Sequence, residues 1–530
     1  MTRTDLFWSA GDRIAQGEIE RAVDGGLEAM ICLHQSRRRS VYLVPVGDVA
    51  EDSKNASPLV LKVHHTATGR HPLRESLKRL FKRSAAGREW RALEALHEQG
   101  VPVPRPRAWG RLGSGDEIIV SDYLEGEHLD DFFREASPES RSQIVTALAR
   151  AIQSLRAADY IHGDLHLGNL WIQANKVYLL DLERARPGRN PHQRLADQAR
   201  LEFSLAKAGW NAGLRASLRH QLGENGLFDS VLRLFLRDYL RGRARRVLRI
   251  GRNWSVASVG QYKGLRESSL DADTLEALFA AAEHDAEPRT RRNGRIQITE
   301  ASANGHPVIV KRVSTGGLLR ALADVLRGSS AARAFHAGQR LGLLTNRAAR
   351  PLAYLEERRF GLPLKSWLVV EKVGDEDLDG LDPKDPALES RLATALGDWL
   401  AEGHAWGLSH RDLKGGNVRV TVEPESIRFW LIDLEDLNGP DELRDDARLL
   451  ALSQLNASLP DDALSLENRR AALDRYLARA PFAETNPMRI AAEISRRSLA
   501  RRHHWQGKGC ALAYDQGQGI SSSRSSPSEP

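Results

Sequence analysis

The sequence predicts an α+β protein built from two consecutive copies of one fold. At 530 residues, the chain exceeds the roughly 250–300 residues at which a single hydrophobic core stops growing, so two or more domains are expected. Short apolar segments rich in β-branched residues precede amphipathic segments, an order typical of a sheet-rich part followed by a helical part. The stretch "YIHGDLHLGNL" (residues 160–170, loop 1) has a close counterpart in "LSHRDLKGGNV" (residues 408–418, loop 2). The chain therefore carries the same pattern twice.

Four further pairs of landmarks recur in the same order in both halves. In the first half, Lys62 at the end of an apolar strand precedes His162 of loop 1 by 100 residues, and in the second half Lys311 precedes His410 of loop 2 by 99. The other pairs are "VPRP" with "AARP", "DQARL" from Asp197 with "DDARL" from Asp445, and "RRVLRIGRNW" from Arg245 with "RRSLARRHHW" from Arg496. Because the period is the size of a domain, it indicates a duplication and not a solenoid.

The elements of the first copy can be predicted in order from their periodicity. Residues 87–100 predict an amphipathic helix, because Trp90, Leu93 and Leu96 recur at helical spacing. The prolines of "GVPVP" end this helix, and mostly helices are expected around and after loop 1. The segments that predict strands, being short, apolar and rich in β-branched residues, are residues 28–35, 40–46, 58–63 and 117–124.

Composition sets the expected domain boundaries. The charged segment "EHDAEPRTRRNGR" is typical of a linker, and the serine-rich end of the sequence is typical of a disordered tail. The expected organisation is a first domain at residues 1–282, a linker at 283–295, a second domain at 296–515 and a tail at 516–530.

The charge of the chain permits an anionic partner. The net charge is +7, and arginines concentrate in residues 241–252 and 496–504. Such runs are either solvated helix faces or contacts to an anionic membrane or glycolipid surface. No nucleic acid partner is expected, since the sequence has neither zinc-finger spacing nor a stacking motif of aromatic residues among its cations. Cys32 and Cys510 lack metal-ligand spacing and are expected to be ordinary thiols.

The sequence also predicts where the protein resides. Charges interrupt the apolar residues of the first segment, and no later stretch stays apolar for the roughly 18 residues of a membrane-spanning helix. We therefore expect a cytoplasmic protein.

Loops 1 and 2 carry the residues that phosphoryl transfer from a nucleotide requires. Such transfer needs a lysine at the phosphates, oxygen ligands for metal and a carboxylate at the attacking hydroxyl. Protein kinases supply these with H-R-D-x-x-x-x-N followed by a metal-binding Asp. Residues 162–169 fit this motif with Gly in place of Arg, and residues 410–417 fit it without substitution. Asp181 and Asp433 then end apolar strands, in Asp-Leu-Glu where protein kinases have Asp-Phe-Gly.

Each of these residues has a predicted role. Asp164 and Asp412 would orient or deprotonate the acceptor hydroxyl. Lys62 and Lys311 would contact nucleotide phosphates, and His166 and Lys414 occupy a place where phosphate contact is possible. The expected ligands of Mg²⁺ are Asn169, Asp181, Asn417 and Asp433.

Other residues are expected to support this chemistry. Glu89 is placed to form an ion pair with Lys62, the alternative being a solvated helical glutamate; its counterpart in the second copy is Ala334. His162 is expected to be structural, and Asp197 and Asp445 to hold the loops through backbone hydrogen bonds. Neither copy has the G-x-G-x-x-G that covers phosphates in protein kinases; "SRRRS" (residues 36–40) at the expected hairpin either binds phosphate or is a solvated loop.

These motifs resemble the protein-kinase-like superfamily, and within it the bacterial lipopolysaccharide kinase (Kdo/WaaP) family. The resemblance rests on "HGDLHLGN" with "LLDLE", on "REW" leading to "GVPVPRP", and on the arginine-rich segment that closes each copy. It implies two tandem protein-kinase-like folds, ATP and Mg²⁺ as cofactors, and a heptose or Kdo sugar of lipopolysaccharide core as acceptor. It also implies an anionic glycolipid partner, with possible peripheral contact at the cytoplasmic face of the inner membrane.

Several alternatives remain open at this level. "HGDLHxGN" also resembles aminoglycoside and choline phosphotransferases, whose acceptors are small alcohols, and "HRDLKGGN" resembles Ser/Thr protein kinases. The second copy is a weak kinase, a substrate-binding domain or a regulatory pseudokinase, because it lacks a counterpart of Glu89. A tandem pseudokinase scaffold is the non-enzymatic alternative.

Overall fold

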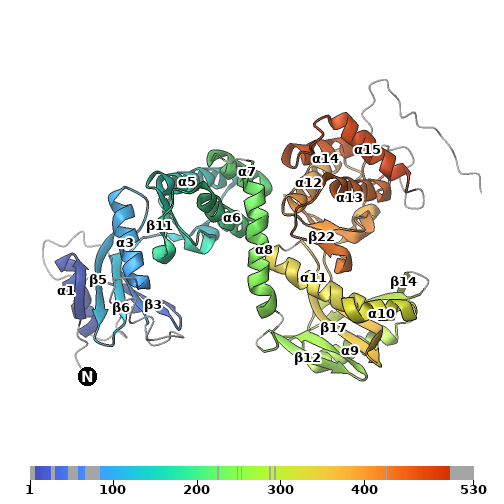
Figure 1. Ribbon diagram of the computed structural model, residues 1–530, viewed down its shortest axis with the longest axis horizontal. Coiled ribbons are helices and arrows are strands. Elements are labelled where there is room, and N and C mark those ends of the chain that lie inside the picture. Colours follow the sequence, from blue (N-terminus) through green and yellow to red (C-terminus); the bar gives the residue numbers. More distant parts are fainter. Residues whose placement is uncertain are drawn as a thin grey trace, which may run out of the picture. The chain divides into compact units, whose positions relative to one another are not determined.

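The computed structural model divides the chain into two compact units, Met1–Leu232 and Arg233–Pro530 (Figure 1). Each unit is described by itself. The structure describes residues 6–24, 30–45, 58–65, 84–223, 226–247, 249–251, 253–285, 288–291, 294–345, 347–424 and 426–501. Within these ranges, no helix combines the length and the apolar character needed to cross a bilayer.

The first unit begins with a six-stranded antiparallel sheet in the order β1-β5-β6-β4-β3-β2. Helix α1 (Arg13–Asp24) covers one face, where Ile19 packs in a core with Leu61 of β4. Helix α3 (Ala85–Glu98) belongs to a second core, in which Trp90 lies with Ile119 of β6. The strands are β1 (Leu6–Gly11), β2 (Ile31–Gln35), β3 (Arg39–Val44), β4 (Leu59–His64), β5 (Pro106–Leu112) and β6 (Glu117–Asp122).

Helices make up most of the rest of the first unit. α5 starts where Ser137 accepts a hydrogen bond from the Ser140 backbone N–H and Pro138 occupies the first turn. A hairpin of β9 (Leu170–Gln173) and β10 (Lys176–Leu179) separates α5 from α6 and carries loop 1 at its start. The helices are α4 (Leu129–Glu135), α5 (Pro138–Ala157), α6 (Pro191–Lys207) and α7 (Ala212–Gln221), and α8 (Phe228–Val247) includes the division between the two units after Leu232.

The second unit repeats this plan with a seven-stranded sheet in the order β12-β13-β17-β18-β16-β15-β14. Its strands are β12 (Trp254–Val259), β13 (Tyr262–Glu267), β14 (Arg289–Arg291), β15 (Ile296–Ala303), β16 (His306–Ser314), β17 (Pro351–Arg359) and β18 (Leu362–Glu371). Helices α9 (Ala272–Glu283), α10 (Leu318–Arg327) and α11 (Ser330–Leu344) accompany the sheet. A hairpin of β21 (Val418–Val422) and β22 (Ile427–Leu431) again follows the loop. The helical part contains α12 (Pro386–Ala405), α13 (Asp445–Ser458), α14 (Leu466–Arg479) and α15 (Pro487–Leu499).

Both units are thus kinase-like folds with a sheet-rich N-lobe and a helical C-lobe, as the sequence predicted. The predicted strands of the first copy correspond to β2, β3, β4 and β6, and the predicted helix to α3. Elements β1, α1 and β5 were not predicted. β5 interrupts its apolar residues with Gly and Arg, and β1 has Ser9 and ends in Gly11, which weakens the periodic signal of a strand.

The domain boundary predicted at residue 282 is wrong. Strands β12 and β13 belong to the second sheet, because β12 pairs with β13 and β13 pairs with β17. The predicted linker, 283–295, contains β14, which pairs with β15. The charged composition of this segment reflects an exposed edge strand, because edge strands carry charge. The predicted tail, 516–530, lies outside the described residues.

Candidate active site

Three elements of the first unit bring the predicted lysine and carboxylates together. Strand β4 carries Lys62, helix α3 carries Glu89, and Asp181 follows the end of β10. Lys62 Nζ donates to Glu89 Oε1 at 2.7 Å and Oε2 at 2.8 Å, and to Asp181 Oδ1 at 3.0 Å. The ion pair predicted from the sequence is present, and the lysine also contacts a predicted metal ligand.

The charges of this cluster stabilise one another. Burial alone would lower the pKa of Lys62, but the carboxylates of Glu89 and Asp181 outweigh it and raise that pKa. Burial alone would raise the pKa of Glu89, but Lys62 and then His64 outweigh it and lower that pKa. All three groups are therefore charged at neutral pH, which fixes the position of the lysine ammonium.

His64 was not predicted to belong to this cluster. It follows Lys62 by two positions on β4, so both side chains point to the same side of the strand. His64 Nε2 lies 3.2 Å from Glu89 Oε2. The i, i+2 spacing on a predicted strand was the signal that could have identified it.

Asp181 is held from both sides. Its backbone is in the left-handed region, with φ 59° and ψ 60°, which turns the carboxylate away from the strand direction. Arg39 of β3 donates from Nη1 to Asp181 Oδ2 at 2.6 Å. Burial opposes the charge of Asp181, but Lys62 and Arg39 hold its pKa well below the usual range. Arg39, one of the three hairpin arginines, thus contacts a predicted metal ligand.

Hydrogen bonds fix the backbone of loop 1. Asp197 accepts from the backbone N–H groups of His162 at 2.7 Å and Gly163 at 3.0 Å, so this aspartate holds the loop as predicted. The buried His162 ring hydrogen-bonds the Leu180 carbonyl through Nε2 at 2.9 Å, next to Asp181. Burial lowers the pKa of His162, so the ring is neutral. His162 is therefore a structural residue.

Asp164 lies at the accessible side of loop 1, with 31% of its side chain exposed. Asn169 Nδ2 donates to the Asp164 carbonyl at 2.9 Å, which places the two predicted functional residues side by side. Arg184 Nη1 is 3.4 Å and Arg200 Nε 3.6 Å from the carboxylate oxygens. The carboxylate lies beside two arginines and is reachable from solvent, as an acceptor of a hydroxyl proton must be.

His166 has a different role from the one its counterpart Lys414 can play. Its Nδ1 accepts the Gly168 backbone N–H at 3.1 Å. Burial lowers the pKa of the ring, so it is neutral near pH 7. Any phosphate contact by His166 would use Nε2–H and no positive charge.

The second unit lacks the glutamate. The N-caps set the equivalence: Ser84 Oγ accepts from the Gly87 N–H at the start of α3, and Ser329 Oγ accepts from the Ala332 N–H at the start of α11. The fifth residue after the cap is Glu89 in one helix and Ala334 in the other, as the sequence predicted. Among the residues that the structure describes, Asp433 is therefore the carboxylate that pairs with Lys311.

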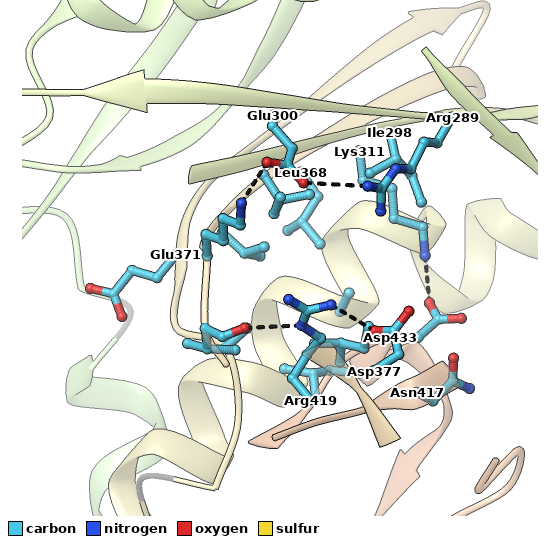
Figure 2. Close-up of a pocket in the computed structure, with 18 of the residues that line it drawn as sticks. Arg289, Ile298, Glu300, Lys311, Leu368, Glu371, Asp377, Asn417, Arg419 and Asp433 are labelled. Carbon is cyan, nitrogen blue, oxygen red and sulfur yellow. Dashed lines mark hydrogen bonds and ion pairs between the residues drawn. The ribbon is translucent and has the colours of Figure 1, made fainter. Parts of the chain in front are cut away.

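A cavity of about 360 Å³ occupies the second unit at this position. Figure 2 shows Lys311 extending across it toward Asp433, with Asn417 beside them. The wall under the sheet is apolar, and an ion pair of Arg419 with Asp377 at 2.9 Å closes the opposite side. Residues that line the wall are Ile296, Ile298, Ile309, Ala334, Leu368 and Val370.

The donor set of this cavity fits a divalent cation. Asn417 Nδ2 donates to the Asp412 carbonyl at 2.8 Å, whereas Asn417 Oδ1 is buried and, among the described residues, has no hydrogen-bond partner. Asp433 repeats the left-handed backbone of Asp181, with φ 62°. An uncompensated amide oxygen beside a carboxylate is the type of ligand pair that Mg²⁺ prefers.

The Lys414 ammonium contacts the carboxylate of Asp412, the residue predicted to accept the hydroxyl proton. Its Nζ lies 2.8 Å from Asp412 Oδ2. Burial would raise the pKa of Asp412, but the hydrogen bond and charge of Lys414 lower it. Lys414 therefore neutralises the predicted base.

Loop 2 is anchored differently from loop 1, and the predicted role of Asp445 is wrong. Asp445 accepts from Arg448 Nη1 at 3.0 Å and from the Ala483 N–H at 2.8 Å, away from the loop. Gln454 Nε2 instead donates to the Arg411 carbonyl at 2.8 Å.

The "D-x-A-R-L" segments are not in structural register. Ser204 Oγ accepts from the Leu167 N–H, 37 positions earlier, and Ser458 Oγ from the Gly415 N–H, 43 positions earlier. When Ser204 and Ser458 are treated as equivalent positions, the buried Ala451 is the counterpart of Asp197. The second loop therefore lacks the carboxylate anchor of the first.

A family comparison agrees with the geometry of both sites. The model of the lipopolysaccharide kinase (Kdo/WaaP) family matches residues 49–217 and 280–476, one segment in each unit. The chain belongs to this family. The two matched segments contain the predicted catalytic and metal-binding residues of both units.

Relatives of this Kdo/WaaP family member match parts of the chain. KEOPS complex subunit Bud32 of Pyrococcus abyssi is 34% identical over 94 residues, which are 18% of this chain and 41% of the relative. Lipopolysaccharide core heptose(I) kinase WaaP of Pseudomonas aeruginosa is 28% identical over 184 residues, 31% of this chain and 62% of the relative. The chain thus spans less than two thirds of either curated relative.

Two solved structures are also similar. WaaP in complex with acyl carrier protein is 21% identical, with coverage of 46% of this chain and 94% of that chain and a TM-score of 0.30. The Cydia pomonella granulovirus kinase PK-1 is 19% identical, with coverage of 32% and 57% and a TM-score of 0.22.

Proposed function

We propose that the protein is an ATP- and Mg²⁺-dependent phosphotransferase whose acceptor is a sugar hydroxyl of lipopolysaccharide core, a heptose or Kdo. The observation that carries this proposal is the Lys62–Glu89–Asp181 ion-pair cluster beside loop 1. A lysine fixed by a buried glutamate and directed at a metal ligand is the arrangement that protein kinases use to position nucleotide phosphates. The sugar class of the acceptor is supported by the family to which the chain belongs.

In this proposal each residue of the first unit has a defined task. Lys62 holds the nucleotide phosphates, and Asp164 accepts the proton of the attacking hydroxyl. Asn169 and Asp181 would hold Mg²⁺, which supplies charge neutralisation at the phosphate oxygens. Each carboxylate oxygen of Asp181 accepts one hydrogen bond, Oδ1 from Lys62 and Oδ2 from Arg39, and keeps a further lone pair for the ion.

The second unit is proposed to bind nucleotide and to act as a regulatory pseudokinase. Its apolar cavity, Lys311 and the Asn417–Asp433 pair support nucleotide and cation binding. One feature opposes efficient catalysis: Ala334 replaces the glutamate that would fix Lys311. The site therefore keeps its binding groups and loses the positioning of its catalytic ones.

The same proposal covers the setting of the reaction. A cytoplasmic protein in peripheral contact with the inner membrane would meet an anionic glycolipid there, and arginine-rich segments favour such contact.

Transfer of labelled phosphate from ATP to extracted lipopolysaccharide core, with and without Mg²⁺, tests the proposal. We expect transfer by the wild type, its loss in Asp164→Asn and its retention in Asp412→Asn. Loss only in Asp412→Asn would reverse the assignment of the two units. Label that appears in small alcohols or in added protein, and never in core sugar, would instead identify a small-molecule phosphotransferase or a Ser/Thr protein kinase.

A further inference from the structure

Helix α10 of the second unit exposes an unusually apolar face. Ala321 is the buried residue of this helix. Leu319 and Leu326 are 85% and 90% exposed, and Leu318, Leu322 and Val325 are also exposed. Five large apolar side chains within one short helix exceed the scattered exposure that is normal for a soluble surface.

A further exposed apolar residue, outside α10, lies at the same end of the sheet. Phe360, 94% exposed, occupies the turn between β17 and β18 with a φ of 51°. Thr315, just before α10, donates from its backbone N–H to the Leu364 carbonyl at 2.8 Å and from Oγ1 to the Pro363 carbonyl at 2.9 Å. These bonds tie the start of α10 to the residues that follow this turn. We call Leu318, Leu319, Leu322, Val325, Leu326 and Phe360 the α10 surface.

Exposed cations accompany the α10 surface, on the other exposed side of the helix and beside Phe360. Arg320 and Arg327 are exposed on α10 itself, and Arg359 is exposed with its guanidinium 5.7 Å from the centre of the Phe360 ring. Asp324 is the one acidic residue within α10, and it pairs with Arg333 at 3.0 Å. Helix α10 is therefore amphipathic on its exposed side, with an apolar face and a positively charged one.

The first copy has the same pattern at the equivalent place in its sequence. Residues 72–83, between β4 and α3, lie outside the described residues and read "PLRESLKRLFKR". Apolar residues recur there at helical spacing among cations. Recurrence of an amphipathic basic segment in both copies indicates that the pattern is not an accident of one helix.

We propose that the α10 surface inserts into the headgroup region of an anionic phospholipid bilayer. A helix with an apolar face and arginines at its border lies in the plane of such an interface, the apolar side chains entering the acyl boundary and the cations meeting phosphate. An aromatic residue at an exposed hairpin tip adds a second insertion point. The inference extends the proposed function, whose acceptor is a glycolipid, but its test requires no phosphate transfer.

Site-specific fluorescence tests the insertion directly. In the full-length chain with Cys32→Ser and Cys510→Ser, a bimane label is placed at Leu319→Cys and, as the matched control, at Ile14→Cys on α1, which is 78% exposed. The vesicles contain phosphatidylcholine alone or equal amounts of phosphatidylcholine and phosphatidylglycerol. We expect a blue shift at residue 319 with the anionic vesicles only and no shift at residue 14.

Co-sedimentation with the same vesicles gives the matching affinity. Leu319→Glu/Leu326→Glu should weaken binding to anionic vesicles by roughly tenfold or more, because it removes two insertion points and adds repulsion. Ile14→Glu should bind as the wild type does. Both variants change largely exposed positions, so circular dichroism should show the wild-type fold.

Three results would overturn the inference. The label at residue 319 could fail to respond to anionic vesicles, the double variant could bind them as the wild type does, or the label could be blue-shifted before lipid is added. The last result would mean that protein covers the surface. Because the vesicles contain no lipopolysaccharide, insertion without phosphate transfer to core would refute the proposed function alone, and transfer without insertion would refute this inference alone.

Discussion

The two units use the same scaffold with different surroundings for the same lysine. In the first, Lys62 contacts two carboxylates, and Asp197 holds the loop backbone. In the second, Lys311 contacts Asp433, and alanines stand where Glu89 and Asp197 would be. The difference separates two properties of a kinase site: groups that bind nucleotide and metal are kept in both units, whereas groups that fix their geometry are found in one.

Removing the glutamate should make the first unit resemble the second. Glu89→Ala leaves Lys62 with Asp181 alone, so the ammonium is no longer fixed, and transfer should fall by about 10²-fold. Glu94→Ala, an exposed change on the same helix, is the matched control and should keep wild-type transfer. The rate of labelled phosphate transfer tests this. A Glu89→Ala enzyme with the wild-type rate would show that the glutamate, which the second unit lacks, is not needed for catalysis.

Removing the loop anchor should have a smaller effect. Asp197→Ala deletes the acceptor of two backbone N–H groups and should lower transfer by about tenfold, through the position of Asp164 and not through nucleotide affinity. Asp445→Ala alters the same sequence motif in the second unit, where it does not touch the loop, and should change little. Separate kcat and KM values test this, because an effect confined to the KM for ATP would contradict the anchoring role.

The smallest expected effect is on the pH dependence of stability. It shows whether the Lys62–Glu89 ion pair contributes to stability as a buried pair does. The folded-state pKa of Glu89 lies below its ordinary value of 4.5. Its stabilisation is therefore complete above that value and is lost as pH falls through the lower folded-state pKa. Urea midpoints should drop more steeply below pH 4.5 for the wild type than for Glu89→Gln. Equal slopes would mean that the pair contributes nothing to stability.

Periodicity and motif spacing were sufficient to predict the two-lobed fold, the Lys62–Glu89 pair and the placement of Asp164, Asn169 and Asp181. These features depend on local pattern and on fixed spacing along the chain. The prediction for Asp445 was wrong, because the helix after loop 2 is shifted by six residues relative to the helix after loop 1. The similar "D-x-A-R-L" segments therefore do not occupy equivalent positions. The contact of Arg39 with Asp181 joins residues 142 positions apart, and only folding reveals it.

The domain boundary failed for a related reason. β13 and α9 lie before the charged segment in sequence but belong to the second sheet and its core. Neither this strand nor this helix carries a motif of its own. Their membership depends on which sheet edge is available, which is a tertiary property.

The most direct test of the division between the units is phosphate transfer by full-length Lys62→Met and Lys311→Met, compared in one assay with ATP, Mg²⁺ and lipopolysaccharide core. We predict that Lys62→Met lowers the rate by about 10³-fold, and that Lys311→Met stays within about threefold of the wild type. Equal losses, or a loss only in Lys311→Met, would contradict the account.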